Sequence, residues 1–502
     1  MQQSSSRIST SAASPFRAEY GHFIGGEWCT GSSGKTIEQF NPATGEVLAR
    51  IQAGSPEDAK RAVDSAAAAL PMWARSSAKE RQDLLLEFAR RLRARAADYA
   101  RMECLNNGKT ITEASYWDIP KSAEIFEYFA GAAYGLHGET HDYADTVSLV
   151  HREPIGVVAQ IIPWNVPLLM MAGKIAPAIV AGCPLVLKPA ETVCLSVLEF
   201  ICEVADLIPK GVVNIVTGYG ADVGEALVTH PAVRKVAFTG SVPTARRILQ
   251  YAATNIIPQT LELGGKSAQV VCPSANIDAA VEGAAMSTVF NKGEVCLAGS
   301  RVFVHESVLD EFTAKLKGVI ESIRIGDPLN AATQLGAQAS KAQYEKIRSY
   351  LELAPREGAS VVTGGGVAKI AGFERGYFIQ PTILGNVSNS MRVAREEIFG
   401  PVTSILSWSS EAEVVRLVND SPYGLAGGIW SRDVGQAHRI AREMQTGTIW
   451  INRYYNYHVG IPLGGYKQSG FGREFAHDIL RDYTITKAVV VSLGDGKLGV
   501  FG

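Results

Sequence analysis

The stretch VVAQIIPWNVPLLMMAGKIAPAIVAGCPLVLKPAE, Val157–Glu191, decides the fold. It begins with a β-rich apolar run, continues through a helical stretch, and returns to a second apolar run that ends near residue 187. This order predicts a strand, a helix and a second strand, which together form a βαβ unit. Because strands that are apolar along their whole length are covered on both faces, the pattern predicts a parallel sheet.

Three further apolar runs keep the same rhythm, VVNIVTG, KVAFTG and LELGG. The five runs end near residues 162, 187, 216, 238 and 262, about 22 to 29 residues apart, which is the step of a βαβ unit. Ligands of such sheets bind beyond the carboxyl ends of the strands. The runs lead into residues that can do chemistry: Pro163-Trp164-Asn165, Lys188 to Glu191, Gly218-Tyr219-Gly220, Thr239-Gly240-Ser241 and Glu262.

A second α/β segment is predicted from about residue 265 to residue 470, with a helix that starts at Ile277 and runs toward Cys296. The boundary between the two segments therefore separates Glu262 from Cys296. Upstream, Ser55 and Ser77 have the positions of helix N-caps before two further predicted helices. These serines are folding signals and carry no chemistry.

The totals exclude several classes of protein. A chain of 502 residues exceeds the usual limit for one hydrophobic core, so two or three domains are expected. A net charge of -2 provides no field for nucleic acid or anionic lipid, and no apolar run approaches the roughly 20 residues that span a bilayer. Seven cysteines without a CxxC pair or zinc spacing predict a reduced, cytoplasmic protein without a metal site. Residues 1–19 are expected to be a disordered tail, although their composition also has features of an organelle presequence.

Cys296 lies in NKGEVCLAGSR, Asn291–Arg301, with a glycine three residues away on either side. It is either buried filling or a nucleophile, and the glycines favour a nucleophile modestly because they let a ligand and backbone N–H groups approach the sulfur. Glu262 ends an apolar strand, where a carboxylate must be paired or face a cavity. Asn165 can donate a hydrogen bond to an oxyanion or shape a turn.

Three places are candidates for holding a dinucleotide. Gly240 and Ser241 lie between a strand and a helix start, where exposed N–H groups favour phosphate, although such turns are common. The stretch GYGADVG, Gly218–Gly224, is similarly weak by itself. Lys188 and Glu191 can grip ribose hydroxyls or form an exposed charge pair.

The joint order of seven motifs changes the balance between these alternatives. PWN, KPAE, FTGS, LELGG, GEVCLAGSR, EEIFGPV and GGYKQSGFGRE follow one another over roughly 300 residues, and this order resembles the aldehyde dehydrogenase superfamily from His22 to Lys487. The resemblance implies an α/β fold with a Rossmann-like parallel-sheet NAD domain (20–131 and 151–264), an α/β catalytic domain (265–470) and a small β-arm oligomerisation domain (132–150 and 480–499). Because isolated arm strands would leave open edges, a homodimer or homotetramer is implied.

By this resemblance, Cys296 attacks an aldehyde carbon to give a thiohemiacetal, whose oxyanion is held by the Asn165 amide and the Cys296 backbone N–H. Hydride transfer to NAD leaves a thioester, and Glu262 activates the water that hydrolyses it to the carboxylic acid. Lys174 is implied to support the oxyanion region. Relatives that transfer the acyl group to coenzyme A usually lack such a glutamate. A CoA-acylating enzyme and a catalytically silent scaffold of the same fold remain the alternatives.

The resemblance also implies the contacts with the cofactor. A carboxylate at Glu191 can bond the 2′-hydroxyl of NAD and would repel the 2′-phosphate of NADP, so NAD is expected. The other residues expected to hold the dinucleotide are Trp164, Lys188, Gly220, Gly240, Ser241 and Leu263, with Glu397 and Phe399 at the nicotinamide ribose.

The expected substrate pocket departs from the family pattern. Val166 and Gly173 stand where relatives frequently carry Phe and Trp, and Leu463 stands where Phe is common. We therefore expect a widened channel for a bulky aromatic or hydrophobic aldehyde. A trimethylammonium substrate is disfavoured, because Gly173 removes an aromatic wall that would attract the cation. The rest of the expected lining is Met170, Phe290, Val295, Leu297, Tyr455 and Tyr457.

Overall fold

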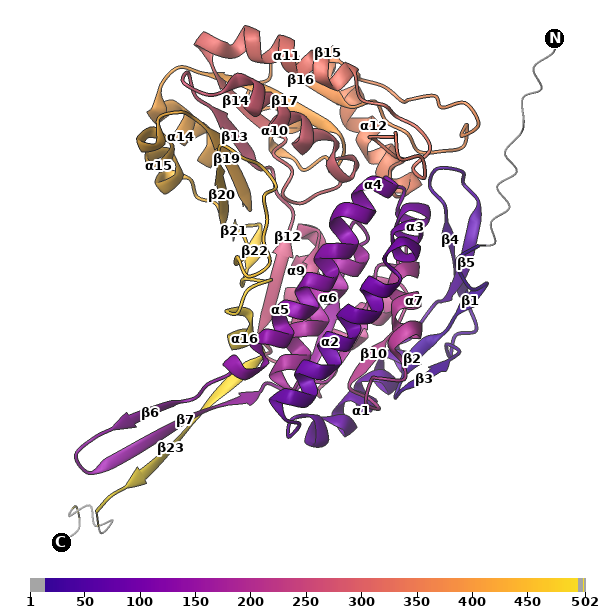
Figure 1. Ribbon diagram of the computed structural model, residues 1–502, viewed down its shortest axis with the longest axis vertical. Helices are drawn as coiled ribbons and strands as arrows, with labels where there is room; N and C mark the ends of the chain where they lie inside the picture. Colours follow the sequence, from indigo (N-terminus) through magenta and orange to yellow (C-terminus); the bar gives the residue numbers. More distant parts are fainter. Residues whose placement is uncertain (1–13, 495–499, 501–502) are drawn as a thin grey trace.

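The computed structural model describes residues 14–494 and 500, which form two α/β lobes and a slender β arm (Figure 1). Part of the predicted N-terminal tail, residues 1–13, lies outside the described residues. The same holds for residues 495–499 of the predicted second arm segment.

The first lobe is built on an eight-stranded sheet with the order β22-β12-β11-β8-β9-β10-β2-β3. Its five central strands are parallel and occupy the five apolar runs, which confirms the predicted parallel sheet. Antiparallel strands border it on both sides. The strands are β2 (His22–Ile24), β3 (Glu27–Cys29), β8 (Val157–Ile161), β9 (Leu185–Lys188), β10 (Val213–Ile215), β11 (Val233–Gly240), β12 (Gln259–Leu263) and β22 (Gly470–Phe471).

Helices cover both faces of this sheet. In β9, Leu185 and Leu187 pack in the core under α2, α5, α6 and α7, whereas Val186 packs in the core under α1, α8 and α9. This alternation explains why the central strands are apolar along their whole length. Capping boxes at Ser55 and Ser77 start α1 and α2, as predicted. The helices are α1 (Pro56–Trp73), α2 (Ala78–Ala94), α3 (Ala96–Asn107), α4 (Ile111–Glu113), α5 (Ile119–Ala132), α6 (Pro167–Ala181), α7 (Leu195–Val204), α8 (Glu225–Thr229) and α9 (Val242–Ala253).

The second lobe has a seven-stranded sheet with the order β15-β16-β17-β14-β13-β19-β20, parallel except for β15. Helices α10 and α11 cover one face, and α12 to α15 cover the other. Its strands are β13 (Ala268–Val271), β14 (Arg301–His305), β15 (Ser360–Thr363), β16 (Thr382–Gly385), β17 (Val402–Trp408), β19 (Ala426–Trp430) and β20 (Thr448–Ile451). Its helices are α10 (Ile277–Val289), α11 (Leu309–Glu321), α12 (Lys341–Arg356), α13 (Arg392–Arg395), α14 (Glu411–Asn419) and α15 (Val434–Glu443).

The arm projects away from both lobes (Figure 1) and is a three-stranded antiparallel sheet with the order β23-β7-β6. Its strands are β6 (Glu139–Asp142), β7 (Thr146–Pro154) and β23 (Thr484–Ser492), and the short helix α16 (Ile479–Asp482) leads into β23. Two small sheets complete the fold: β1 (Glu19–Tyr20), β4 (Thr36–Phe40) and β5 (Val47–Gln52), and the pair β18 (Tyr423–Gly424) with β21 (Tyr466–Lys467).

The described residues contain neither a membrane-spanning helix nor a cluster of metal-binding side chains. Within residues 14–494 and 500, none of the helices has the length and apolarity that a membrane crossing requires. The same residues contain no group of three or more His, Cys, Asp or Glu side chains that could hold a metal ion. All seven cysteines are free thiols.

Candidate functional site

Cys296 is delivered by a left-handed turn that follows α10. The 3₁₀ segment η4 (Phe290–Gly293) contains three consecutive residues with positive φ, at 44° for Asn291, 60° for Lys292 and 72° for Gly293. A Cβ atom at Gly293 would lie 2.2 Å from the Gly400 carbonyl, so only glycine fits this close approach. The chain then turns back, and Cys296 lies partly exposed at the wall of a cavity.

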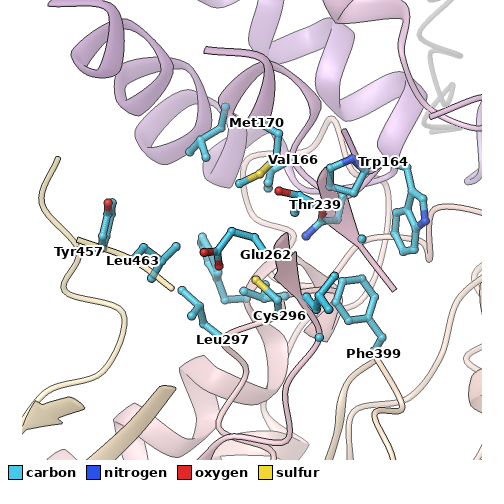
Figure 2. A pocket seen from close by; sticks show the side chains of 18 of the residues that line it. Trp164, Val166, Met170, Thr239, Glu262, Cys296, Leu297, Phe399, Tyr457 and Leu463 are labelled. Atoms are coloured by element: carbon cyan, nitrogen blue, oxygen red, sulfur yellow. The ribbon is translucent and has the colours of Figure 1, made fainter. Parts of the chain in front are cut away.

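This cavity has a volume of about 240 Å³ and lies where the carboxyl ends of β8, β11 and β12 meet the second lobe. Figure 2 shows Cys296 and Glu262 in its middle, with Leu463 and Tyr457 to one side and Trp164 and Phe399 to the other. The cavity brings together most of the residues predicted for the pocket and the chemistry: Asn165, Val166, Met170, Glu262, Phe290, Val295, Cys296, Leu297, Tyr455, Tyr457 and Leu463.

Glu262 stands near the carboxyl end of β12, directly beside Thr239 of β11 in the register of the sheet. It is 6% exposed, and its Oε1 atom has no hydrogen-bond partner among the described residues. Burial raises the pKa of Glu262 well above its usual value, and the nearby Glu474 carboxyl raises it further, while Lys174 and Arg473 oppose the shift. The result is a carboxyl group that is free to bind water and holds its proton to a higher pH than usual.

The Cys296 thiol is in a similar environment. Burial raises the pKa of Cys296 to about 12, and the carboxylates of Glu397 and Glu262 contribute to the rise. The backbone N–H groups of Leu297 and Cys296 act in the opposite direction. The Cys296 thiol therefore holds its proton to a higher pH than an exposed cysteine does.

The Asn165 side chain is close to the loop that carries Cys296. Its amide nitrogen donates a hydrogen bond of 3.0 Å to the backbone carbonyl of Glu294, two residues before the thiol. Asn165 is 6% exposed and lines the cavity. The side chain is thus oriented by the backbone of the segment that carries Cys296.

Lys174 does not line the cavity. It lies on the buried face of α6, where its ammonium group forms an ion pair with Glu474. Glu474 is 2% exposed and was not predicted from the sequence, because 300 residues separate it from its partner. Both members of this pair act on the pKa of Glu262. Lys174 therefore affects the pKa of Glu262 through its own charge and through its ion pair with Glu474.

The opposite half of the cavity is lined by six of the residues predicted for the cofactor: Trp164, Gly240, Ser241, Leu263, Glu397 and Phe399. Ser241 is the N-cap of α9. Glu397 accepts a hydrogen bond of 2.9 Å from the Gly265 N–H. The rings of Trp164 and Phe399 stand edge to face, with centroids 5.4 Å apart.

Lys188, Glu191 and Gly220 are outside this cavity. Lys188 Nζ lies 3.2 Å from a carboxylate oxygen of Glu191, just past the end of β9. Gly220 is exposed at the start of the π-helical segment η3 (Gly220–Gly224), which follows β10. Lys188 therefore ends a strand, and Glu191 and Gly220 follow the carboxyl ends of strands, in the same sheet as β8, β11 and β12.

These residues fit a dinucleotide by their own chemistry. The start of α9, where N–H groups favour phosphate, opens onto the cavity through Gly240 and Ser241. The buried Thr239 hydroxyl beside them has no hydrogen-bond partner in the described part of the chain. The carboxylates of Glu397 and Glu191 are groups that can accept hydrogen bonds from hydroxyls such as those of a ribose.

The prediction for Gly173 is wrong. Gly173 does not line the cavity, and a Cβ atom there would lie 2.4 Å from the ring of Phe475. The space that a large side chain would take on α6 is filled by this phenylalanine from a distant loop, and Phe475 itself lines the cavity. An aromatic wall is therefore present, and the argument against a trimethylammonium substrate loses its basis.

Several lining residues were missed by sequence reasoning. Trp117 and Lys121 lie in and after the π-helical segment η1 (Ala114–Asp118), and the Trp117 ring packs edge to face on Phe290 at 5.2 Å. Gln343 and Lys346 of α12 line the cofactor half. No local pattern distinguishes these residues from ordinary helix residues. The remaining missed lining is Ile125, Leu169, Gly264, Val459 and Phe475.

Comparison with known proteins identifies the relatives of this chain. The model of the aldehyde dehydrogenase family matches residues 28–489. An acetaldehyde dehydrogenase of Pseudomonas aeruginosa is 42% identical over 494 residues, which cover 97% of both chains. A solved structure of betaine aldehyde dehydrogenase from Staphylococcus aureus in complex with NAD+ superposes with a TM-score of 0.94 at 37% identity, covering 96% of both chains. An NAD+ complex of an aldehyde dehydrogenase from Bacillus cereus has a TM-score of 0.92 at 39% identity, covering 95% of this chain and 97% of that one.

Proposed function

The chain belongs to the aldehyde dehydrogenase family, and we propose on this premise that it oxidises an aldehyde to the carboxylic acid through a covalent intermediate on Cys296, with NAD as the hydride acceptor. One observation carries the proposal. A thiol, a carboxyl group whose Oε1 atom has no hydrogen-bond partner among the described residues, and a side-chain amide line the same cavity, in Cys296, Glu262 and Asn165.

In the first step, a carbon–sulfur bond forms between the Cys296 sulfur and the carbonyl carbon, the π bond of the carbonyl group breaks, and the thiol proton passes to a solvent water molecule. The carbonyl oxygen becomes an oxyanion. The Asn165 amide and the Cys296 backbone N–H hold this oxyanion, and the hydrogen bond from the Asn165 amide to the Glu294 carbonyl orients the amide before the charge develops. Bound NAD supplies the acceptor for the hydride that leaves the former carbonyl carbon.

In the last step, water hydrolyses the thioester on Cys296. Glu262 takes a proton from this water. Its raised pKa suits the role, because a base is most effective when its pKa lies near the working pH. Lys174 supports the same step from behind the cavity, where its pair with Glu474 sets the charge that Glu262 experiences.

For the cofactor, the start of α9 at Gly240 and Ser241 binds the pyrophosphate, and Trp164 and Leu263 pack against the dinucleotide. Glu397 accepts hydrogen bonds from the nicotinamide ribose, with Phe399 beside it. Lys188 and Glu191 hold the adenosine ribose, and Gly220 borders the adenosine. The Glu191 carboxylate favours NAD over NADP, since it repels a 2′-phosphate.

For the substrate, the cavity favours an aromatic or hydrophobic aldehyde. Val166 and Leu463, two of the three positions at which a smaller side chain was expected to widen the channel, line the cavity, whereas Gly173 does not. The rest of the reason is the rings of the wall. Trp117, Phe290, Tyr455, Tyr457 and Phe475 line the cavity around the aliphatic side chains. Flat apolar walls bury an aromatic aldehyde better than a two-carbon one.

Two other accounts share the fold. In a CoA-acylating enzyme the thioester would pass to a second thiol, and the free carboxyl group of Glu262 beside Cys296 argues for water as the acceptor instead. A silent scaffold has no need of a thiol, a free carboxyl group and an amide in one cavity. The free thiols agree with a reducing compartment, and we assign the protein to the cytoplasm.

We also propose that the protein is a homodimer or homotetramer joined through the arm. β23 carries exposed apolar residues along its length, with Val489, Val490 and Val491 at 40%, 65% and 44% exposure. Exposed apolar residues on a projecting β sheet mark a surface that another protein chain covers. We propose that a second copy of this chain covers the arm.

The test is NADH formation, followed by absorbance, with benzaldehyde, acetaldehyde and betaine aldehyde as substrates. We expect turnover with NAD, a lower kcat/KM with NADP, and the highest kcat/KM with benzaldehyde. Cys296→Ala should abolish NADH formation and leave NAD binding unchanged in calorimetry. Equal or better use of acetaldehyde would refute the substrate class, and a requirement for coenzyme A would refute the hydrolytic step.

A further inference from the structure

Beside the cavity lies a fully buried polar cluster that the mechanism does not use. We call it the clamp, and it consists of Asn107, Asn291, Lys292 and Glu294. Three of its members are 0% exposed and Asn291 is 2% exposed. Charged and amide side chains are rarely buried so completely without a specific arrangement of partners.

The clamp holds the two backbone segments that position the oxyanion donor. The Asn291 amide donates to the carbonyl of Glu294 at 3.1 Å and to the carbonyl of Asn165 at 3.1 Å. The Asn107 amide donates to the carbonyls of Trp164 at 2.9 Å and Asn165 at 3.3 Å. The Glu294 carbonyl is also the group that receives the Asn165 side-chain amide.

Lys292 connects these two sets of contacts. Its ammonium group donates to the backbone carbonyl of Asn107 at 3.0 Å and to the Asn107 side-chain oxygen, and it lies 3.1 Å from a carboxylate oxygen of Glu294. The other carboxylate oxygen of Glu294 accepts from the Ala339 N–H at 3.1 Å. The Lys292 ammonium group therefore connects the loop before Cys296 with Asn107, the last residue of α3. Asn107 in turn holds the backbone at Trp164 and Asn165, just before α6.

The backbone of the loop makes this tie necessary. Asn291 and Lys292 both have positive φ, which costs free energy for residues with a Cβ and persists only where surrounding contacts fix it. The Asn291 N–H is held by Glu113 at 2.7 Å, and the Lys292 side chain supplies the contacts on the other side. Without the ammonium group, Glu294 loses the ion pair of its side chain with Lys292, and this ion pair helps to fix the direction of the Glu294 backbone carbonyl.

We propose that Lys292 is a positioning residue for the oxyanion step, acting through Glu294 and Asn107 to hold the Asn165 amide where the oxyanion forms. This inference rests on the proposed function of Cys296 and Asn165. Lys292 touches neither the substrate cavity nor the thiol. Its contribution therefore depends on the presence of the Asn165 amide.

A double-mutant cycle between Lys292 and Asn165 tests this dependence. The readout is the rate of the pre-steady-state burst of NADH, which reports the steps up to the thioester. We expect Lys292→Met to slow the burst at least tenfold in the unmodified protein and less than threefold in the Asn165→Ala background. Equal losses in the two backgrounds, or no loss in the first, would overturn the proposal.

Two controls separate positioning from general damage. Lys235→Met removes another buried lysine, whose Nζ lies 3.3 Å from the Thr260 hydroxyl, and should lower stability while the burst rate stays within twofold. Alkylation of Cys296 by iodoacetamide needs no oxyanion donor, so its rate in Lys292→Met should also stay within twofold. If alkylation falls in parallel with the burst, the loop has collapsed and Lys292 is merely structural. Should Lys292→Met fail to fold, Lys292→Gln enters the same cycle, with a smaller loss expected in the unmodified background.

A crystal structure of the Lys292 variant gives a readout that is independent of turnover. The Asn165 Nδ2 to Glu294 O distance, 3.0 Å here, should lengthen beyond hydrogen-bonding range. An unchanged distance would overturn the proposal even in an active enzyme. Absence of NADH from the unmodified protein with every aldehyde would instead refute the proposed function and leave this geometric result to be judged separately.

Discussion

At the scale of single residues, the chemistry depends on what burial does to two acids that share a cavity. Burial raises the pKa of Cys296 to about 12 and also raises the pKa of Glu262. The effect weakens the thiol as a resting nucleophile, and it brings the carboxyl group closer to the pH at which a base works. The two groups are therefore suited to different steps, attack by the thiol and hydrolysis by water.

If Glu262 acts only in hydrolysis, Glu262→Gln should stop turnover after the thioester has formed. Loss of a general base typically slows a step by about 10²- to 10⁴-fold, so steady-state turnover should fall within that range. Rapid mixing should still reveal one equivalent of NADH per site in a burst. Cys296→Ala is the matched control and should give no burst. A Glu262→Gln protein without burst amplitude would move Glu262 to an earlier step.

The Lys174–Glu474 pair predicts opposite pH effects from its two members. Lys174 lowers and Glu474 raises the pKa of Glu262. Lys174→Met removes the cation and leaves Glu474 unneutralised, so the pKa of Glu262 should rise, and the acid limb of the deacylation rate should move to higher pH. Glu474→Gln should move it to lower pH. Both variants lose the same ion pair, so a shift of both limbs in one direction would contradict this account.

A control for the pair is Lys109→Met. Lys109 is another fully buried lysine, with its Nζ 2.5 Å from Asp118, and it does not act on the pKa of Glu262. Its loss should destabilise the protein and leave the acid limb unchanged.

Individual residues differ in how far the sequence could predict them. Glu262 lies near the end of one apolar strand and Asn165 follows another, and the carboxyl ends of parallel strands meet at one edge, so their proximity follows from strand order. Cys296 was placed by motif. Glu474 pairs with Lys174, and Phe475 packs against Gly173, but both come from a loop far along the chain. The sequence around Lys174 and Gly173 gives no indication of these contacts. Contacts of this kind depend on tertiary packing, which residue patterns do not encode locally.

At the scale of elements, the regular parts were predictable and the irregular ones were not. Apolar runs fixed β8 to β12, and serine caps fixed the starts of α1 and α2. The π-helical turn η1, which places Trp117 in the cavity, adds one residue to a helical turn and leaves no mark in the hydrophobic pattern. In the left-handed turn η4 before Cys296, only one of the three residues with positive φ is a glycine, Gly293. The sequence therefore could not predict this backbone conformation.

The packing of Phe475 against α6 predicts how the pocket can be enlarged. Phe475 is 3% exposed and fills the space beside Gly173. Phe475→Ala should cost about 3 kcal/mol of stability, as truncation of a buried ring does, and should open the cavity toward α6. The ratio of kcat/KM for naphthaldehyde to that for benzaldehyde should then increase several-fold.

The matched control is Phe312→Ala. Phe312 is 0% exposed, belongs to α11 and packs in the core of the second lobe, outside the cavity lining. It should show a similar loss of stability in thermal unfolding and no change in the ratio. If the two variants changed the ratio alike, Phe475 would be an ordinary core residue.

At the scale of the whole molecule, the site exists only because two lobes meet. Glu262 comes from the sheet of the first lobe, and Cys296 comes from the loop that leads into β14 of the second. β22, from the far end of the chain, pairs with β12 at Glu262 and crosses back between the lobes. A hinge motion between the lobes would therefore change the distance between thiol and base directly.

The arm lies apart from this junction (Figure 1), so assembly can be tested without touching the chemistry. Val490 is 65% exposed on β23, and Val490→Lys places a charge in the proposed interface. We expect the oligomer to dissociate at least tenfold more readily, as measured by sedimentation velocity over a range of concentrations. Val434→Lys is the matched control, since Val434 is 56% exposed at the start of α15 and outside the arm. An oligomer that survives Val490→Lys unchanged would mean that subunits meet through another surface and that the apolar stripe of the arm has a different partner.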